Sequence, residues 1–343
     1  MKLGIALLNT GAPDALRESV ENFDRAIAMR RKLPLDENPE FRYGLAAGLI
    51  NRGDALARLG GAKNIEDAIQ SHGEAIALLQ TLPLHENPLY LKRLAIAWVN
   101  RGIALEAQAA PQREAALFAE AGDCFQNAIA LVAPSPHAAT AELALVLAVA
   151  RVNRAGALLR ISGDAAAPAA RAEAEQALSH LAACDAAELP VAEAGLKARH
   201  VLCRALLGQI TSAPPEDESL RLDLSGEITD AVEEGLRLVR ERPEVPAFRA
   251  LGTELFQVGT LIYERSQPQF LADFLLDHLD PAHPACVNPV DPAWLAFADE
   301  SLARAGSLLR ASSFEELATD AGRQRLGVFV RMANAREKLK SLS

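Results

Sequence analysis

The sequence predicts an all-α solenoid built from about six antiparallel helical hairpins. A heptapeptide occurs in two nearly identical copies, LPLDENP at residues 33–39 and LPLHENP at residues 82–88, whose starts are 49 residues apart. Repetition at a fixed spacing of this size is typical of stacked structural repeats. Half of the 343 residues are hydrophobic and only 5% are aromatic, a composition that suits closely packed helices and disfavours a mainly β fold.

Each heptapeptide predicts the end of one helix and the start of the next. Its Leu-Pro cannot continue a helix, since proline lacks an amide hydrogen and restricts the residue before it. Its Asn-Pro favours a new helix, because Asn38 and Asn87 are good N-caps. Pro39 and Pro88 then occupy the first helical position, where a missing donor costs nothing. We therefore interpret the heptapeptide as a helix junction, with a surface recognition motif as the alternative.

A second junction divides the 49-residue unit into two antiparallel helices. Gly60 and Gly61 are expected to end one helix and Asn64 to cap the next, with Asp67 completing a capping box. The second helix then carries an apolar stripe that one partner helix cannot cover, so neighbouring repeats must stack on it. The stripe consists of Ile65, Ala68, Ile69, His72, Ile76 and Leu79.

The same register continues along the chain. The first helices align as LINRGDAL at 49–56, WVNRGIAL at 98–105, RVNRAGALL at 151–159 and, more weakly, RHVLCRALL at 199–207. The second helices align from residues 23, 72 and 124, with fainter copies near 171, 230 and 298. We therefore expect regular repeats over residues 1–210. Residues 211–343, which begin with the polar linker TSAPPEDESL, are expected to form divergent helical repeats that close the solenoid.

The aligned positions resemble the tetratricopeptide repeat (TPR) family. In that family the first helix carries an Asn shortly before a small residue, with a Leu or aromatic residue three places later. The matching triplets are Asn51, Gly53 and Leu56, then Asn100, Gly102 and Leu105, then Asn153, Ala155 and Leu158. The second helix of the family has spaced small residues and a following proline, which are matched by Ala68, Ala75 and Pro83 and partly by Ala26 and Pro34. The resemblance covers residues 1–160 and implies an extended variant, because the usual period is about 34 residues.

The resemblance also implies where a ligand would bind. In this family the Asn lies on the concave surface and hydrogen-bonds the backbone of a bound peptide, which implies such a row at Asn51, Asn100 and Asn153. Arg58 and Arg160 follow seven residues later on nearly the same helix face and can pair with carboxylates of the same ligand. We therefore predict a site for a peptide or partner protein at these five residues. The alternative is that they bond neighbouring backbone or water and keep the surface polar.

One position departs from the family pattern. Arginine stands where the family usually has an apolar residue, at Arg52, Arg101 and Arg154. This departure argues against transferring the family's known ligand patterns, including the clamp for acidic chaperone tails. We expect these arginines either to form ion pairs between repeats or to contact a partner. The candidate acceptors are Asp54, Glu74 and Glu106.

We predict a protein that is not an enzyme and binds no cofactor or metal, because no phosphate loop, nucleophile elbow or paired catalytic carboxylates are found. The alternative function is a metal-dependent enzyme or sensor in the segment 263–294, which breaks the repeat pattern. Most of its polar residues are spread over a proline-rich loop, so capping and turn roles are favoured. They are Asp273, Asp277, His278, Asp280, His283 and Cys286. His180 with Cys184 and His200 with Cys203 have helical ligand spacing, but their Ala- and Leu-rich surroundings favour core positions.

Charge and hydropathy restrict the partners. The net charge of −10 disfavours nucleic acid and anionic membranes. No segment is long and apolar enough for a membrane span, and the start MKLGIALLNTGAPDAL is interrupted too soon for a signal peptide. The four scattered cysteines do not indicate a disulfide framework. We therefore expect a cytoplasmic protein whose partner is a protein or peptide.

The first residues predict a short helix at the edge of the stack. In the 49-residue register the chain enters in the middle of a first helix, which leaves about ten residues for it. Leu3, Leu7 and Leu8 would then have no preceding repeat to cover them. We expect self-association through residues 1–30, or cover by a partner or an upstream segment. The alternative is a frayed end that the fold tolerates.

Overall fold

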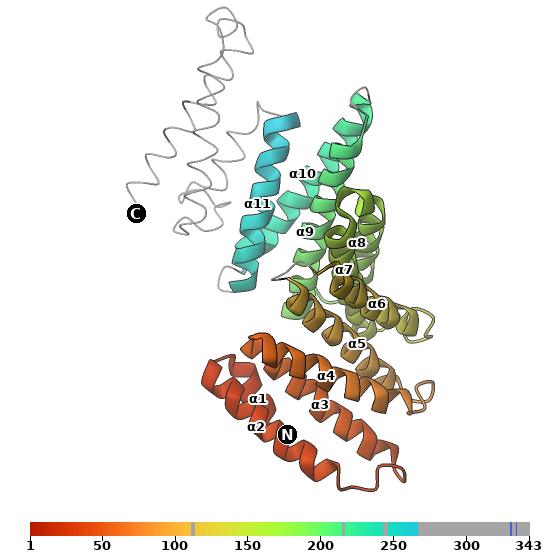
Figure 1. The fold of residues 1–343 in the computed structure, drawn as a ribbon. Helices are drawn as coiled ribbons and strands as arrows, with labels where there is room; N and C mark the ends of the chain where they lie inside the picture. The colour runs from red at the N-terminus through yellow and green to blue at the C-terminus, as the bar shows by residue number, and fades with distance from the viewer. Residues whose placement is uncertain (111–113, 215–216, 243–245, 267–329, 331–333, 335–343) are drawn as a thin grey trace, which may run out of the picture. The chain divides into compact units, whose positions relative to one another are not determined.

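The computed structural model describes residues 1–110, 114–214, 217–242 and 246–266, together with Val330 and Asn334. Every regular element in these ranges is helical, and within each of two compact units consecutive helices pack against one another (Figure 1), which confirms the predicted all-α solenoid. The helices are α1 Lys2–Thr10, α2 Pro13–Arg30, α3 Pro39–Leu59, α4 Ala62–Gln80, α5 Pro88–Ala109, α6 Ala115–Val132, α7 Ala141–Ser162, α8 Ala167–Leu181, α9 Leu189–Ser212, α10 Glu218–Glu241 and α11 Pro246–Ser266. A short 3-10 helix, η1 Gly163–Ala166, precedes α8.

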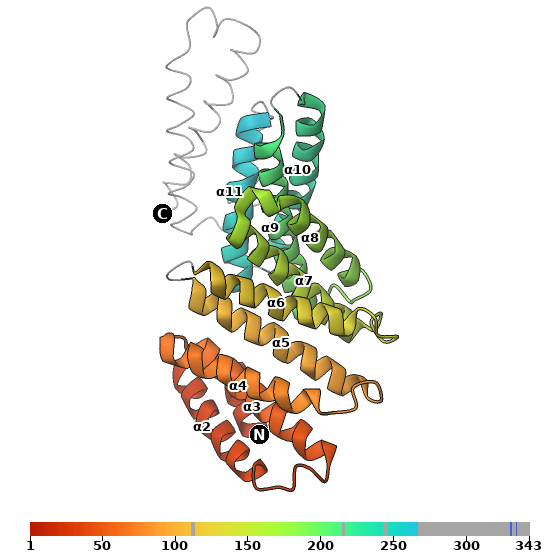
Figure 2. The same ribbon diagram turned by 45° about the vertical axis from the view of Figure 1, so that its right-hand side comes forward.

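The chain forms two compact units, of which the first is Met1–Ala186 and the second begins at Ala187. In the first unit the helices α1 to α8 pair in order as four hairpins, and each hairpin packs on the next (Figure 2). In the second unit α9 pairs with α10, and α11 packs against both. The copy of the second helix expected near residue 298 lies outside the described residues. The predicted change from regular to divergent repeats at residue 210 stays a prediction.

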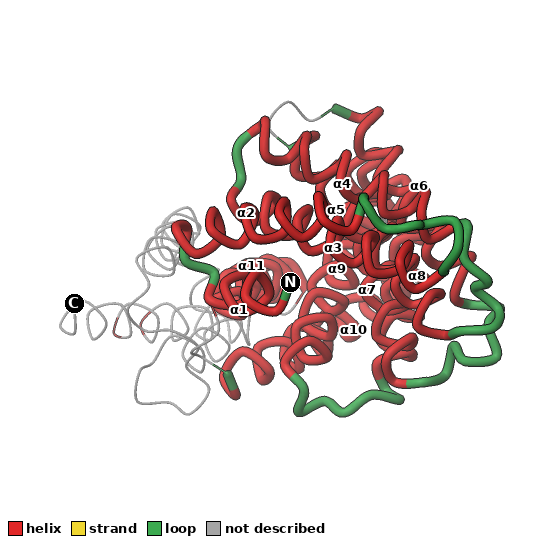
Figure 3. The backbone as a smooth tube through the Cα atoms, turned by 90° about the horizontal axis from the view of Figure 1, so that it is seen from below, coloured by secondary structure: helices red, strands yellow, loops and turns green. Residues whose placement is uncertain are grey.

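Loops connect one hairpin to the next in the first unit (Figure 3), and the two heptapeptide junctions, between α2 and α3 and between α4 and α5, have the predicted chemistry. The Asn38 side chain accepts a hydrogen bond from the Glu40 amide at 2.8 Å, and the Asn87 side chain accepts one from the Leu89 amide at 2.9 Å. The following prolines are the first residues of α3 and α5. Both N-cap predictions are therefore confirmed.

The predicted cap at Asn64 is wrong. The helix α4 already begins at Ala62, because Gly61 takes the N-cap position with a φ of 85° that suits glycine. The Ile65 amide then donates the first helical hydrogen bond to the Gly61 carbonyl at 3.0 Å. Asn64 lies inside the first turn and donates to the Gly60 carbonyl at 2.7 Å. Its role is therefore to tie α4 to the end of α3, and no capping box with Asp67 forms.

The core of the first unit depends on close approach between the two helices of a hairpin. A Cβ atom added at Gly102 of α5 would lie 2.5 Å from the Phe125 ring of α6, and one added at Gly53 of α3 would lie 2.5 Å from the His72 ring of α4. Both rings are fully buried. The predicted apolar stripe of α4 is buried at every position except Ile69, which is half-buried. Small residues in the first helices therefore make room for rings in the second helices.

Candidate functional site

The first helices of successive hairpins form an inner layer in the first unit. The helices α3 and α5 contact each other directly, and so do α5 and α7. Between α4, α6 and α8 the described residues make no comparable contact. Because the first helices approach one another more closely than the second helices do, the stack of hairpins curves around α3, α5 and α7. The predicted binding residues lie on these three helices.

The three asparagines of the predicted row are all half-buried, but their hydrogen bonds differ. The Asn100 amide group donates to Asp54 Oδ1 at 2.7 Å and so joins α5 to α3. The Asn153 amide group donates to the Val149 carbonyl of its own helix at 2.9 Å. Within the described part of the chain, the Asn51 side chain has no hydrogen-bonding partner. The row is present in sequence register, but only Asn51 keeps its amide group unengaged.

A difference between the repeats explains why Asn153 does not copy Asn100. Asn100 reaches Asp54 on the preceding first helix, and the residue one repeat later than Asp54 is Ile103. An isoleucine cannot accept a hydrogen bond, so Asn153 turns to the carbonyl of its own preceding turn. Asn100 and Asn153 therefore occupy equivalent positions in successive repeats but form different hydrogen bonds.

The two predicted arginines both reach back to the preceding hairpin. Arg58 donates to the Leu8 carbonyl at 3.1 Å, where it satisfies the C-terminal end of α1. Arg160 pairs with Glu106 at 2.6 Å and lies over the Phe118 ring at 5.7 Å. Burial raises the pKa of the Glu106 carboxyl, while the Arg160 charge opposes that rise. Both arginines are exposed, so they have internal contacts and also remain accessible from solvent.

Further polar contacts join the first helices near their N-terminal ends. The Tyr90 hydroxyl of α5 donates to Glu40 of α3 at 2.5 Å. The Arg93 guanidinium lies over the Tyr43 ring at 5.8 Å. Lys92 of α5 pairs with Glu142 of α7 at 2.7 Å. The inner layer is therefore mixed in charge, and most of its charged groups bridge successive first helices.

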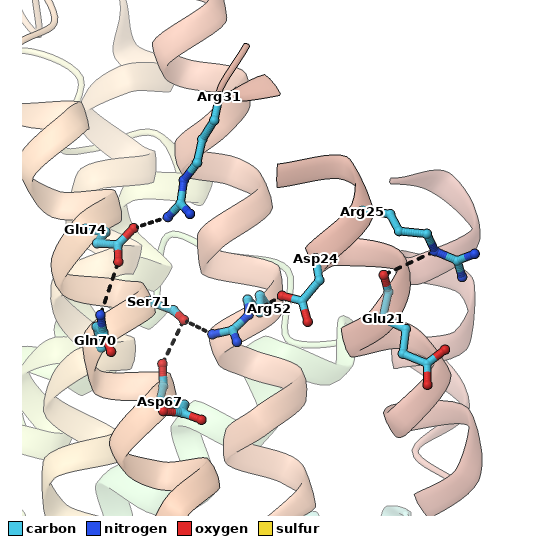
Figure 4. Close-up of polar contacts among 9 residues, drawn as sticks. All are labelled: Glu21, Asp24, Arg25, Arg31, Arg52, Asp67, Gln70, Ser71 and Glu74. Carbon is cyan, nitrogen blue, oxygen red and sulfur yellow. Dashed lines mark hydrogen bonds and ion pairs between the residues drawn. The ribbon is translucent and has the colours of Figure 1, made fainter. Parts of the chain in front are cut away.

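The repeated arginines form ion pairs, but the predicted acceptors are wrong. Arg52 lies between Asp24 of α2 and the Ser71 hydroxyl of α4, at 2.6 and 2.7 Å (Figure 4). The two later arginines pair with carboxylates on the second helix of their own hairpin, Arg101 with Glu120 and Arg154 with Glu173. In all three hairpins the arginine and a polar partner are 19 residues apart. The recurring 19-residue spacing was a signal in the sequence that our prediction missed.

Glu74, one of the predicted acceptors, does form a contact between hairpins. It accepts from Arg31 at the end of α2 at 2.6 Å, beside Gln70 on its own helix (Figure 4). Both partners are about half exposed, with side-chain exposures of 55% and 40%. An exposed pair of this kind contributes about 0–1 kcal/mol to stability. It marks how the C-terminal end of α2 faces α4.

The residues considered for metal binding do not gather in the described part of the chain. No group of three or more His, Cys, Asp or Glu residues with metal-binding geometry occurs there. Segment 263–294 lies outside the described residues from position 267 onward. The predicted core positions are confirmed for His200 and Cys203, which are buried, and are wrong for His180 and Cys184, which are partly exposed. His200 pairs with Glu254 at 2.7 Å.

Comparison with known protein families finds no family model that matches this chain, and no curated protein gives a significant match. Among the described helices, none combines the length and apolarity needed to cross a membrane.

Proposed function

We propose that this protein is a non-catalytic TPR-like adaptor that binds a peptide segment or a partner protein on the inner layer formed by α3, α5 and α7. The observation that carries the proposal is the half-buried Asn51 amide group, which has no partner among the described residues. A partly buried amide gains stability when a peptide backbone donates to it and accepts from it. Arg58 and Arg160 lie exposed on the same layer and can add contacts to carboxylates. A cytoplasmic location belongs to the same proposal.

Asn51→Ala is expected to weaken partner binding about 3- to 10-fold, the loss of one or two peptide hydrogen bonds. The partner is first isolated with the intact chain as bait and identified by mass spectrometry, and its affinity is then measured with purified components. Asn51 is a better target than Asn100 or Arg58, because those two also stabilise contacts between hairpins.

Asn127→Ala is the matched control, since this asparagine is exposed on the second helix α6, away from the inner layer. It should leave the affinity unchanged. Equal affinities for the intact chain and the Asn51→Ala variant, with both folded, would remove the inner layer from consideration.

The second candidate function is a metal-dependent enzyme or sensor in segment 263–294. It rests on the cluster of Asp, His and Cys in the sequence alone, because residues 267–329 lie outside the described part. Elemental analysis of protein purified without chelator separates the two candidates. A stoichiometric transition metal would favour the second, and its absence the adaptor.

Self-association through α1 is a further proposal for the partner surface. Leu3 and Ile5 are 57% and 38% exposed, whereas Leu8 is buried in the core of the first unit, contrary to the expectation that it is uncovered. The residue one repeat after Leu3 is Arg52, which contacts Asp24 of the preceding hairpin. Leu3 therefore occupies a position that, in the next repeat, faces a preceding hairpin.

We expect sedimentation velocity to show a dimer that forms with increasing concentration and weakens in Leu3→Glu. Asn9→Glu, which adds the same charge at another exposed position of α1, should keep the dimer. A strict monomer across the accessible concentration range would show that the exposed face of α1 is tolerated as it is.

A further inference from the structure

A histidine occupies an aromatic core position in the second hairpin. His72 lies 19 residues after Gly53, and in the first hairpin Phe23 lies 19 residues after Gly4. Both rings contact the glycine of the facing helix, where an added Cβ would be 2.5 Å from His72 and 2.9 Å from Phe23. The exposed fraction of His72 is 1%. A titratable ring has therefore taken the place of a phenylalanine.

The surroundings of His72 favour its neutral form. Its Nδ1 atom is buried and has no hydrogen-bonding partner in the described structure, and its Nε2 atom is 3.7 Å from Asp54 Oδ1. The charged groups that face it are Asp54 from α3 and Arg101 from α5. A protonated ring would leave one N–H unsatisfied and would repel Arg101. Burial, with the Arg101 charge second, accordingly lowers the pKa of His72 to about 4.

Asp54 is the acidic partner in this cluster, and it has a route to solvent. Its side chain is 28% exposed on the inner layer, and its Oδ1 accepts from Asn100 at 2.7 Å. It faces Arg58 on its own helix, Arg93 and Asn100 on α5, and His72 on α4. Burial raises the pKa of Asp54 to about 6, against the opposing effects of Arg58, the Asn100 hydrogen bond and Arg93.

We propose that Asp54 and His72 form a proton-binding pair, and that folding reverses which of the two side chains takes up a proton first as the pH falls. Under mildly acidic conditions the folded chain holds its proton on the solvent-accessible Asp54 carboxyl, whereas the unfolded chain holds it on the imidazole of His72. Acidification then removes one negative charge from the inner layer while the stability of the fold changes little. Any change in partner binding that follows from this loss of charge rests on the function proposed above. The titration of Asp54 and His72 does not depend on that function.

The two residues have opposite effects on stability between about pH 6 and pH 4. The folded pKa of Asp54 is raised from 3.8 to about 6, so its contribution to stability is present at low pH and is lost as the pH rises through 6. The folded pKa of His72 is lowered from 6.5 to about 4, so its contribution is present above pH 6.5 and is lost as the pH falls through 4. The folded and unfolded pairs therefore each bind about one proton near pH 5, and the two effects cancel.

Replacing either residue should reveal a pH dependence of stability that the two residues cancel in the unaltered chain. The midpoint of urea unfolding of the first unit is measured at pH 7 and pH 5. His72→Phe introduces the side chain that Phe23 has at the equivalent position of the first hairpin. In this variant the midpoint should be higher at pH 5 than at pH 7. In Asp54→Asn it should be lower at pH 5. His85→Ala removes a histidine that is 83% exposed and should behave like the unaltered chain.

Direct titration of the unaltered protein provides a test that does not depend on how the variants fold. The Asp54 carboxyl and His72 ring signals are followed by NMR from pH 7 to pH 4. The expected result is an Asp54 midpoint near 6 and a His72 ring that stays mostly neutral until the pH approaches about 4. A His72 ring that protonates before Asp54, or variants that both keep the pH dependence of the unaltered chain, would overturn the proposal. Either failure would leave the binding surface at Asn51 untouched.

Discussion

Truncation of Phe125 to alanine is expected to lower the free energy of unfolding of the first unit by about 3–5 kcal/mol. The Phe125 ring is fully buried between α5, α6 and α7, in a cluster that includes Val99, Leu105 and Leu147. Its loss removes apolar contacts and leaves a cavity where α5 approaches closely at Gly102. Helix α5 can follow only if the contacts of α3 and α7 with it also change, which limits collapse of the cavity.

The two units require a probe that reports on the first one alone. Trp98 packs against the same cluster as Phe125, and Trp294 is the other of the two tryptophans of the chain. In a Trp294→Phe background, the fluorescence of Trp98 therefore reports urea unfolding of the first unit. The neighbouring exposed residue supplies the control Gln126→Ala, which should change the free energy by less than about 0.5 kcal/mol. A similar small change in Phe125→Ala would mean that the cluster does not hold the hairpins together.

Helix junctions could be predicted from the sequence because their chemistry is local. Asn38 and Asn87 each precede a proline, and an N-cap followed by the fixed φ of proline leaves the chain few alternatives. The N-cap of α4 was predicted at Asn64, three residues after the true cap at Gly61. Glycine can itself serve as an N-cap when a positive φ is required, and the sequence alone does not show which of two nearby caps the chain uses.

The partners of the polar side chains depend on how whole helices face one another, so the sequence predicted them poorly. Arg52 was expected to pair between repeats with Asp54, Glu74 or Glu106, and it contacts Asp24 and Ser71. The 19-residue spacing that joins the repeated arginines to the second helix arises from the length of a hairpin turn and two half-helices. It exceeds the reach of helix periodicity, which relates residues three or four apart.

The largest electrostatic effect is expected at Glu173, the acidic member of a partly buried cluster between α7 and α8. Its two carboxylate oxygens pair with different arginines, Arg154 and, at 2.7 Å, Arg151. The side chains of Glu173 and Arg151 are only 13% exposed, and Arg151 also lies 3.3 Å from the Nε2 atom of His180. Removing the carboxylate leaves two like charges together, and both are largely shielded from water.

Glu173→Ala is therefore expected to lower the free energy of unfolding of the first unit by about 2–3 kcal/mol, somewhat less than the 3–5 kcal/mol typical of fully buried pairs because water can reach Arg154. Glu120 provides the matched control. It has the same 19-residue relation to Arg101, but its side chain is 45% exposed, so Glu120→Ala should cost only about 0–1 kcal/mol. Both are measured by urea unfolding with Trp98 as the probe. Equal losses in the two variants would show that burial does not distinguish the two pairs.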